Sequence, residues 1–304
     1  MIQIPCYIGG IDTVEVSSTS FVTGKYDYLS FDSSRQTIIS GDITRFKYRI
    51  NPDKKVERDI HSFSEYITVI NDIFEELELE DILICRVDFR FDDYNNEYSD
   101  LFKLNQLLFY LLSIKQFKIK DYCSFGIKSP ISKTLRIHNS HIEAEFYNKK
   151  IQEPNSKIKS RLELRTKGMN HSIWFEIGES KKRIEEIELD RWIDRLDKVA
   201  NLKKEDYDNA FEKLNNEIIK CYNADIERKE YRKGDYNSMI QRYNKYIFTR
   251  RQLVDLFKRL NYNSPESMAS KYKKSHVGIE FFSNYEVKKY IKLIRFVAKT
   301  FIDS

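Results

Sequence analysis

Three short segments of the chain alternate between charged and apolar residues. They are 86–93 (RVDFRFDD), 141–147 (HIEAEFY) and 161–165 (RLELR). Because successive side chains of a strand point to opposite faces of a sheet, each segment is predicted to put an apolar row into a core and a polar row on the other face. A half-exposed antiparallel sheet has the same pattern, so a solvent-facing polar row is the alternative.

The rest of the first half of the chain also favours strands, with helices between them. Strands are predicted at 2–4, 14–16, 26–31, 43–50, 82–91 and 134–147, and helices at about 62–79 and 99–114. This interleaving predicts an α+β fold in which helices cover one face of a central, mainly antiparallel sheet.

The second half of the chain is predicted to be helical, and its end is basic. Residues 175 to about 225 have helical spacing, and the segment from 227 to the end holds 18 Lys and Arg against 8 Asp and Glu. We predict two domains, 1–225 and 226–304, with the boundary within 200–245. Such charge asymmetry is typical of a nucleic-acid surface, although a solvated lysine-rich helix gives the same count.

The basic end has the pattern of a winged helix-turn-helix. A helix is predicted at 249–260, a second one begins after the N-cap Ser264 with Pro265 in its first turn, and 278–282 is a predicted wing. A plain helical hairpin is the alternative. The residues expected to contact DNA are Arg250, Arg251, Lys258, Arg259, Lys271, Lys273 and Lys274.

Composition favours a cytoplasmic protein without a membrane segment. The four cysteines are scattered without a CxxC pair, which argues against a disulfide framework and a zinc ribbon. We expect no signal peptide and no membrane helix, because no apolar run has the necessary length.

The polar rows of the three alternating segments suggest a metal site. Asp88, Glu143, Glu145, Glu163 and His141 are expected to converge on one sheet face. Carboxylates with a single imidazole suit Mg²⁺ or Mn²⁺. Like charges brought together are unfavourable unless a cation or arginines neutralise them.

Tyr147 shares its predicted face with Glu143 and Glu145, and Lys149 and Lys150 follow it directly. A phenol is a poor nucleophile until a cation stabilises its phenolate, and lysines neutralise phosphate charge. Tyrosine, divalent ion and lysines together predict a DNA-nicking site. The chain has 20 tyrosines, and the alternatives are Tyr94, Tyr98, Tyr122, Tyr243 and Tyr246.

At these residues the chain resembles a known family. Segment 86–93, the FYNKK of 146–150 and the RLELR of 161–165 are similar, in this order, to motifs of the trans-acting plasmid Rep family of rolling-circle replication initiators. The stretch 138–149 is also similar to the gene II endonucleases of filamentous phages. The resemblance covers roughly 82–168. Related proteins often carry a pair of metal-binding histidines around one apolar residue, which this chain lacks.

The resemblance implies a metal-dependent endonuclease that nicks origin DNA. It implies a five-stranded antiparallel sheet with flanking helices, a 5′-phosphotyrosine link at Tyr147 and a free 3′-OH that primes synthesis. Expected partners are double-stranded origin DNA, single-stranded DNA and a host helicase, and a homodimer is left open. The alternatives are a conjugative or mobilisation relaxase of the same chemistry and a non-catalytic DNA-binding regulator.

Overall fold

The fold is known from a computed structural model that describes residues 7–31, 37–39, 43–95, 135–138, 141–201, 203, 205, 250–259, 261–275 and 284–304. The elements predicted at 2–4 and 99–114, and the wing predicted at 278–282, lie outside these residues. Within the described ranges, no helix combines the length and the apolar character needed to cross a bilayer.

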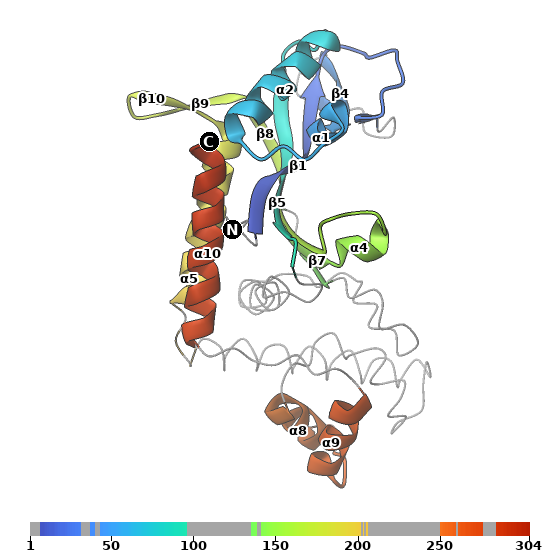
Figure 1. The fold of residues 1–304 in the computed structure, drawn as a ribbon, viewed down its shortest axis with the longest axis vertical. Coiled ribbons are helices and arrows are strands. Elements are labelled where there is room, and N and C mark those ends of the chain that lie inside the picture. Colours follow the sequence, from blue (N-terminus) through green and yellow to red (C-terminus); the bar gives the residue numbers. More distant parts are fainter. Residues whose placement is uncertain are drawn as a thin grey trace, which may run out of the picture.

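A single antiparallel sheet forms the centre of the described structure (Figure 1). Its strands are β1 (Tyr7–Ser18), β2 (Leu29–Phe31), β3 (Thr37–Ile39), β4 (Ile43–Ile50), β5 (Leu83–Asp93), β6 (Leu135–His138), β7 (Ile142–Tyr147) and β8 (Ser160–Ser172). They pair in the order β2-β4-β1-β5-β8-β7-β6, with β3 also on β4. Every pairing is antiparallel, which confirms the predicted sheet.

Three helices pack on the apolar face of this sheet: α2 (Phe63–Glu76), α5 (Ile184–Ala200) and α10 (Asn284–Ile302). Trp192 of α5 is fully buried, and its indole nitrogen donates to the Thr166 hydroxyl of β8 at 3.2 Å. The ring of Phe301 in α10 lies edge-on to Phe63 of α2, with centroids 5.8 Å apart. Figure 1 shows α5 and α10 side by side. The predicted α+β class, with a central antiparallel sheet and flanking helices, is thus confirmed.

The C-terminal helix α10 belongs to the packing of the sheet, although it lies in the predicted second domain. Arg295 pairs with Asp197 of α5 at 3.0 Å, and the Ser64 hydroxyl donates to the Ser304 carbonyl at 2.8 Å. Helices α8 (Arg250–Arg259) and α9 (Pro265–Ser275) pack on each other. The division at 225/226 stays a prediction.

Local sequence signals place two of these helices. The Ser62 hydroxyl accepts from the Glu65 backbone N–H at 3.1 Å and caps α2, because the first turn of a helix leaves such groups unpaired. Pro265 opens α9 directly after Ser264, as predicted, since proline fits the first helical position.

Two predicted elements differ from the structure, the first in continuity and the second in type. The strand predicted at 134–147 is interrupted, and its two parts pair as the hairpin β6–β7. The start of the helix predicted from 175 is a second hairpin, β9 (Trp174–Ile177) and β10 (Ser180–Arg183), and α5 begins at Ile184. Gly178 makes this hairpin turn with φ of +60°, a conformation open to glycine.

The close approach of α10 to β1 depends on Gly9. A side chain there would begin 3.2 Å from Val297 Cγ1 and 3.3 Å from the Val297 carbonyl oxygen. We expect Gly9→Val to overpack this contact and lower the free energy of unfolding by about 1–3 kcal/mol, measured by urea denaturation. Ser30→Val, at an exposed strand position, is the control and should change the free energy of unfolding by less than about 0.5 kcal/mol. Equal stabilities of the two variants would contradict this packing.

Candidate active site on the charged sheet face

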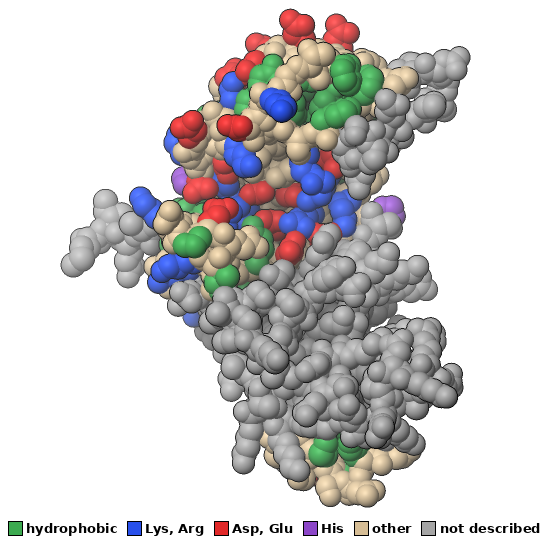
Figure 2. Space-filling model, turned by 90° about the vertical axis from the view of Figure 1, so that its right-hand side faces the viewer, with side chains coloured by type: hydrophobic (Ala, Val, Ile, Leu, Met, Phe, Trp, Pro, Cys, Tyr) green, Lys and Arg blue, Asp and Glu red, His purple; other side chains and the backbone are tan. Residues whose placement is uncertain are grey.

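The polar rows of β5, β8 and β7 lie beside one another and are buried. Register pairs Asp88 with Arg165 and Arg165 with Glu143, and on the next rung it pairs Glu163 with Glu145. Side chains paired in register share a face, so the separate alternations of the three strands merge into one surface. Figure 2 shows acidic and basic side chains interleaved in a band across the described part of one side of the molecule. The alternative of a solvent-facing row is therefore wrong for most of these residues. The buried residues of this charged face are Asp88, Arg90, Asp92, Glu143, Tyr147, Arg161 and Glu163.

Arg165 sits at the centre of one cluster on this face. Its guanidinium contacts all four predicted carboxylate ligands: Glu143, Glu163, Glu145 at 2.7 Å and Asp88 at 3.3 Å. Burial lowers the pKa of Arg165, but the carboxylates, led by Glu163, raise it well above its usual value overall. Arg165 is thus held as a permanent cation in the position where the carboxylates converge.

Two more cations pair with carboxylates of this cluster. Arg86 donates through Nε to Asp88 at 2.6 Å, and Lys167 donates to Glu143 at 2.5 Å. Buried carboxylates are stable only when they are paired in this way.

A second cluster adjoins the first and is centred on Arg161. This arginine makes a bidentate pair with Asp92, at 2.6 and 3.1 Å, and it also contacts Asp12. Asp12 lies at an irregularity in the pairing of β1 with β5, between Ile11 and Thr13. Because Arg161 is the register partner of Tyr147, this charge lies next to the tyrosine.

Tyr147 ends β7 and is 6% exposed. Its hydroxyl donates a hydrogen bond to Glu163 Oε1. Burial, and then the negative charge of Glu163, hold the pKa of Tyr147 well above its usual value. The phenol is therefore neutral near pH 7 and needs a proton acceptor if it is to act as a nucleophile.

Glu163 is placed to be that acceptor. Burial raises the pKa of Glu163 to about 7, with Asp12 adding to the effect and Arg165 opposing it. A carboxylate with this pKa takes up a proton near neutral pH far more readily than an ordinary one. The contact between Tyr147 and Glu163 thus has the geometry and the charge that a nucleophile–base pair would need.

Lys149 and Lys150 follow Tyr147 in the short helix α4 (Lys149–Gln152). The Asn148 side chain caps this helix by accepting from the Ile151 backbone N–H at 3.2 Å. Lys149 pairs with Glu153 at 2.6 Å, and Lys150 is exposed. Both lysines therefore lie directly beyond the strand end that carries the tyrosine.

The structure does not bring His141 into the carboxylate cluster. The β6–β7 hairpin places it at a bend before β7, where its side chain is exposed. The predicted alternation assumed that the strand extends through residue 141. The register partner of Glu143 is instead His138 of β6.

As placed, the predicted ligands do not form a metal site. Among the described residues, no three His, Cys, Asp or Glu side chains have an arrangement that could hold an ion. The carboxylate oxygens suit Mg²⁺ or Mn²⁺ chemically, but the Arg165 guanidinium lies between them. A divalent ion fits here only if Arg165 moves, and the metal site stays a prediction.

The predicted DNA-binding residues lie on the pair of helices α8 and α9. Lys258 and Arg259 are exposed in the last turn of α8, and Lys258 lies 3.8 Å from Glu266 of α9. For Arg250, Arg251, Lys271, Lys273 and Lys274 only the helical backbone is described. Their role in DNA binding stays a prediction.

The sequence analysis missed the roles of Arg161, Arg165 and Asp12. The arginines were recognised only as members of a polar row, although they flank Glu163 two residues away on either side. That spacing puts all three on one face and is the signal that could have identified the neutralising cations. No comparable signal in the sequence marks Asp12.

Comparison with solved structures gives a distant likeness. The chain is similar to the solved structure of a rolling circle replication initiator protein from Geobacillus stearothermophilus, with 16% identity and a TM-score of 0.30. The match covers 53% of this chain and 75% of that one. No protein-family model and no curated protein matches the chain.

Proposed function

We propose that this chain initiates rolling-circle replication by nicking one DNA strand with Tyr147. The observation that carries the proposal is the buried hydrogen bond from the Tyr147 hydroxyl to Glu163, a carboxylate whose pKa is raised to about 7. Such a pair is suited to transferring a phosphoryl group to tyrosine.

In the proposed step, the Tyr147 oxygen attacks a backbone phosphorus and its proton moves to Glu163. A phosphorus–Oη bond forms and the bond from phosphorus to the 3′-oxygen breaks. The 3′-oxygen leaves and takes up a proton from water. The products are a 5′-phosphotyrosine and a 3′-OH that can prime synthesis.

Cations near Tyr147 favour binding of a phosphate there. Arg161 lies next to the tyrosine in register, and Lys149 and Lys150 follow it in the chain. Fixed positive charge in a buried site stabilises the extra negative charge of the transition state. We assign these residues to phosphate binding, with Tyr147 as the nucleophile.

The metal and the partners belong to the proposal as well. A bound Mg²⁺ or Mn²⁺ would polarise the phosphate oxygens once Arg165 has moved, with Asp88, Glu143 and Glu145 as its candidate ligands. Glu163, the fourth predicted ligand, is assigned here to the proton of Tyr147. Origin DNA would be bound by the basic residues of α8 and α9, and single-stranded DNA by the nicking site. A host helicase would follow the nick, and the location would be the cytoplasm.

Of the alternatives, a non-catalytic regulator is disfavoured by one observation. Three carboxylates (Asp88, Glu143 and Glu163) and Tyr147 from three strands are buried within contact of each other or of Arg165, an arrangement that DNA binding alone does not require. A relaxase with the same chemistry fits this arrangement equally well.

The proposal predicts a pH dependence. Glu163 accepts a proton only when ionised, so the single-turnover rate of nicking should fall about tenfold per pH unit below about 7 and level off above it. The Glu163→Gln variant should nick DNA slowly, and its rate should no longer depend on pH in this range. A wild-type rate that is flat from pH 5.5 to 7.5 would contradict the role of Glu163.

The effect of Glu163 on the stability of the fold has a different pH dependence from its effect on the nicking rate. The pKa of Glu163 is raised in the folded chain above its ordinary value of 4.5, so its contribution to stability is greatest at low pH and is lost as the pH rises towards about 7. Thermal unfolding measured over the same pH range separates the two effects, because this contribution changes in the opposite direction to the rate.

A further inference from the structure

The β9–β10 hairpin carries large apolar side chains that are partly exposed. Trp174, Phe175 and Ile177 are 42%, 45% and 44% exposed. Figure 1 shows the hairpin projecting from the sheet beyond the helices. Clustered exposed apolar side chains on a projecting element are typical of a binding surface.

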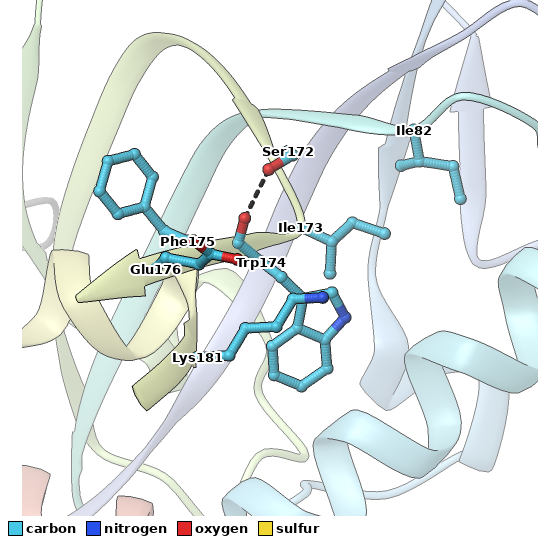
Figure 3. A pocket seen from close by; sticks show the side chains of 7 residues that line it. All are labelled: Ile82, Ser172, Ile173, Trp174, Phe175, Glu176 and Lys181. Atoms are coloured by element: carbon cyan, nitrogen blue, oxygen red, sulfur yellow. Dashed lines mark hydrogen bonds between the residues drawn. The ribbon is translucent and has the colours of Figure 1, made fainter. Parts of the chain in front are cut away.

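The two faces of the hairpin differ. Register pairs Trp174 with Arg183 and Glu176 with Lys181 on one face. Phe175 and Ile177 belong to the other face, because successive strand residues alternate. The Trp174 face opens onto a depression of about 630 Å³, which is also lined by Ile82 and Ile173 (Figure 3).

Two cations lie close to the Trp174 ring. The Arg183 guanidinium carbon is 5.4 Å and the Lys181 ammonium 5.9 Å from the ring centroid. Arg183 is buried and is held by Glu185 at 2.8 Å, so its own guanidinium is fixed in place beside the indole. Among the described residues Lys181 makes no ion pair, whereas Lys182 pairs with Glu186 at 2.8 Å. Lys181 is thus the cation that a ligand can use.

We propose that this depression binds an unpaired nucleobase of a single DNA strand, stacked on Trp174 with its phosphate at Lys181. Every base has a π-face, so an exposed indole beside a cation binds single strands of any sequence. The choice of DNA rests on the proposed function, whereas the stacking site follows from the hairpin itself.

The test uses the intrinsic fluorescence of the full chain. The chain has two tryptophans, and Trp192 is fully buried, so quenching by an added oligonucleotide reports on Trp174. The probe is an oligothymidylate of roughly 12 nucleotides, within the usual span of single-strand sites. A blunt-ended DNA duplex of the same length serves as the comparison ligand.

We expect the single strand to quench Trp174 and the duplex to have little effect. Trp174→Ala should weaken single-strand binding, measured by anisotropy of a labelled probe, about tenfold, since the base would lose its stacking partner. Trp174→Phe should lose less of the single-strand affinity, because phenylalanine keeps an aromatic ring. Glu176→Gln should strengthen binding about twofold, because Glu176 lines the same depression and repels phosphate.

The matched control is Ile177→Ala, which removes a side chain of equal exposure on the opposite face. If it weakens binding as much as Trp174→Ala does, the hairpin binds by general apolar contact and the stacking site is wrong. Quenching by the duplex alone, or no quenching at saturation, also overturns the proposal. Fluorescence quenching needs no reaction at Tyr147. The stacking site can therefore be tested even if the proposed nicking activity is absent.

Discussion

Tyr147→Phe is expected to abolish covalent attachment of the protein to DNA. The substitution removes only the hydroxyl that donates to Glu163, so the site keeps its shape while it loses the nucleophile. The yield of the covalent adduct should fall by roughly a thousandfold or more, as is typical when a nucleophile is removed. The free energy of unfolding should fall by only about 1 kcal/mol, since one hydrogen bond is lost.

The measurement uses supercoiled plasmid that carries the coding sequence with its flanking DNA. Nicking is followed on agarose gels, and the adduct is detected by denaturing electrophoresis. Tyr94→Phe is the matched control, because Tyr94 follows β5 and lies near Asp59 and Asp92 on the same charged face. If Tyr147→Phe forms the adduct and Tyr94→Phe does not, the nucleophile is Tyr94 and not Tyr147.

Arg165→Leu is expected to be the most destabilising single change on the charged face. It leaves four carboxylates converging without the cation that contacts all of them. Removing one partner of a buried ion pair lowers stability by about 3–5 kcal/mol. Arg49→Leu is the control: it breaks a 3.5 Å pair between an exposed arginine and Glu15, and the loss should be below about 1 kcal/mol.

The same variant tests the metal prediction. With Arg165 gone, the carboxylates form an oxygen-rich site, so Mg²⁺ or Mn²⁺ should raise the melting temperature of Arg165→Leu more than that of the wild type. Arg165→Lys, which keeps the charge with fewer donors, should lie between the two and provides a folded variant if the leucine variant does not fold. Equal shifts in all three proteins would argue against an ion among these carboxylates.

The candidate site could be predicted from sequence as far as its strands and faces. The alternation in β5, β7 and β8 placed Asp88, Glu143, Glu163 and Tyr147 on one face, because side-chain direction follows residue number along a strand. The geometry among them could not be predicted this way, since it depends on which residues are opposite each other. Only the register showed that Glu163 contacts Tyr147 and that Arg165 occupies the centre.

The errors have a common physical origin. His141 was assigned to the face because the strand was assumed to be continuous, but β6 pairs back on β7 and His141 falls at the bend between them. The β9–β10 hairpin was predicted as helix, although Gly178 allows the tight turn there. In each case pairing between strands overrode the local pattern.

The sequence by itself determined that residues 86–93, 141–147 and 161–165 each carry a charged row and an apolar row, so Tyr147 shares a face with carboxylates. Local periodicity is enough for this, because it is a property of each strand alone. Only the tertiary structure decided that the charged rows are buried, that arginines neutralise them and that Glu163 contacts the Tyr147 hydroxyl. The physical reason is that burial, and with it the raised pKa of Glu163, arises from contacts between residues distant in the chain.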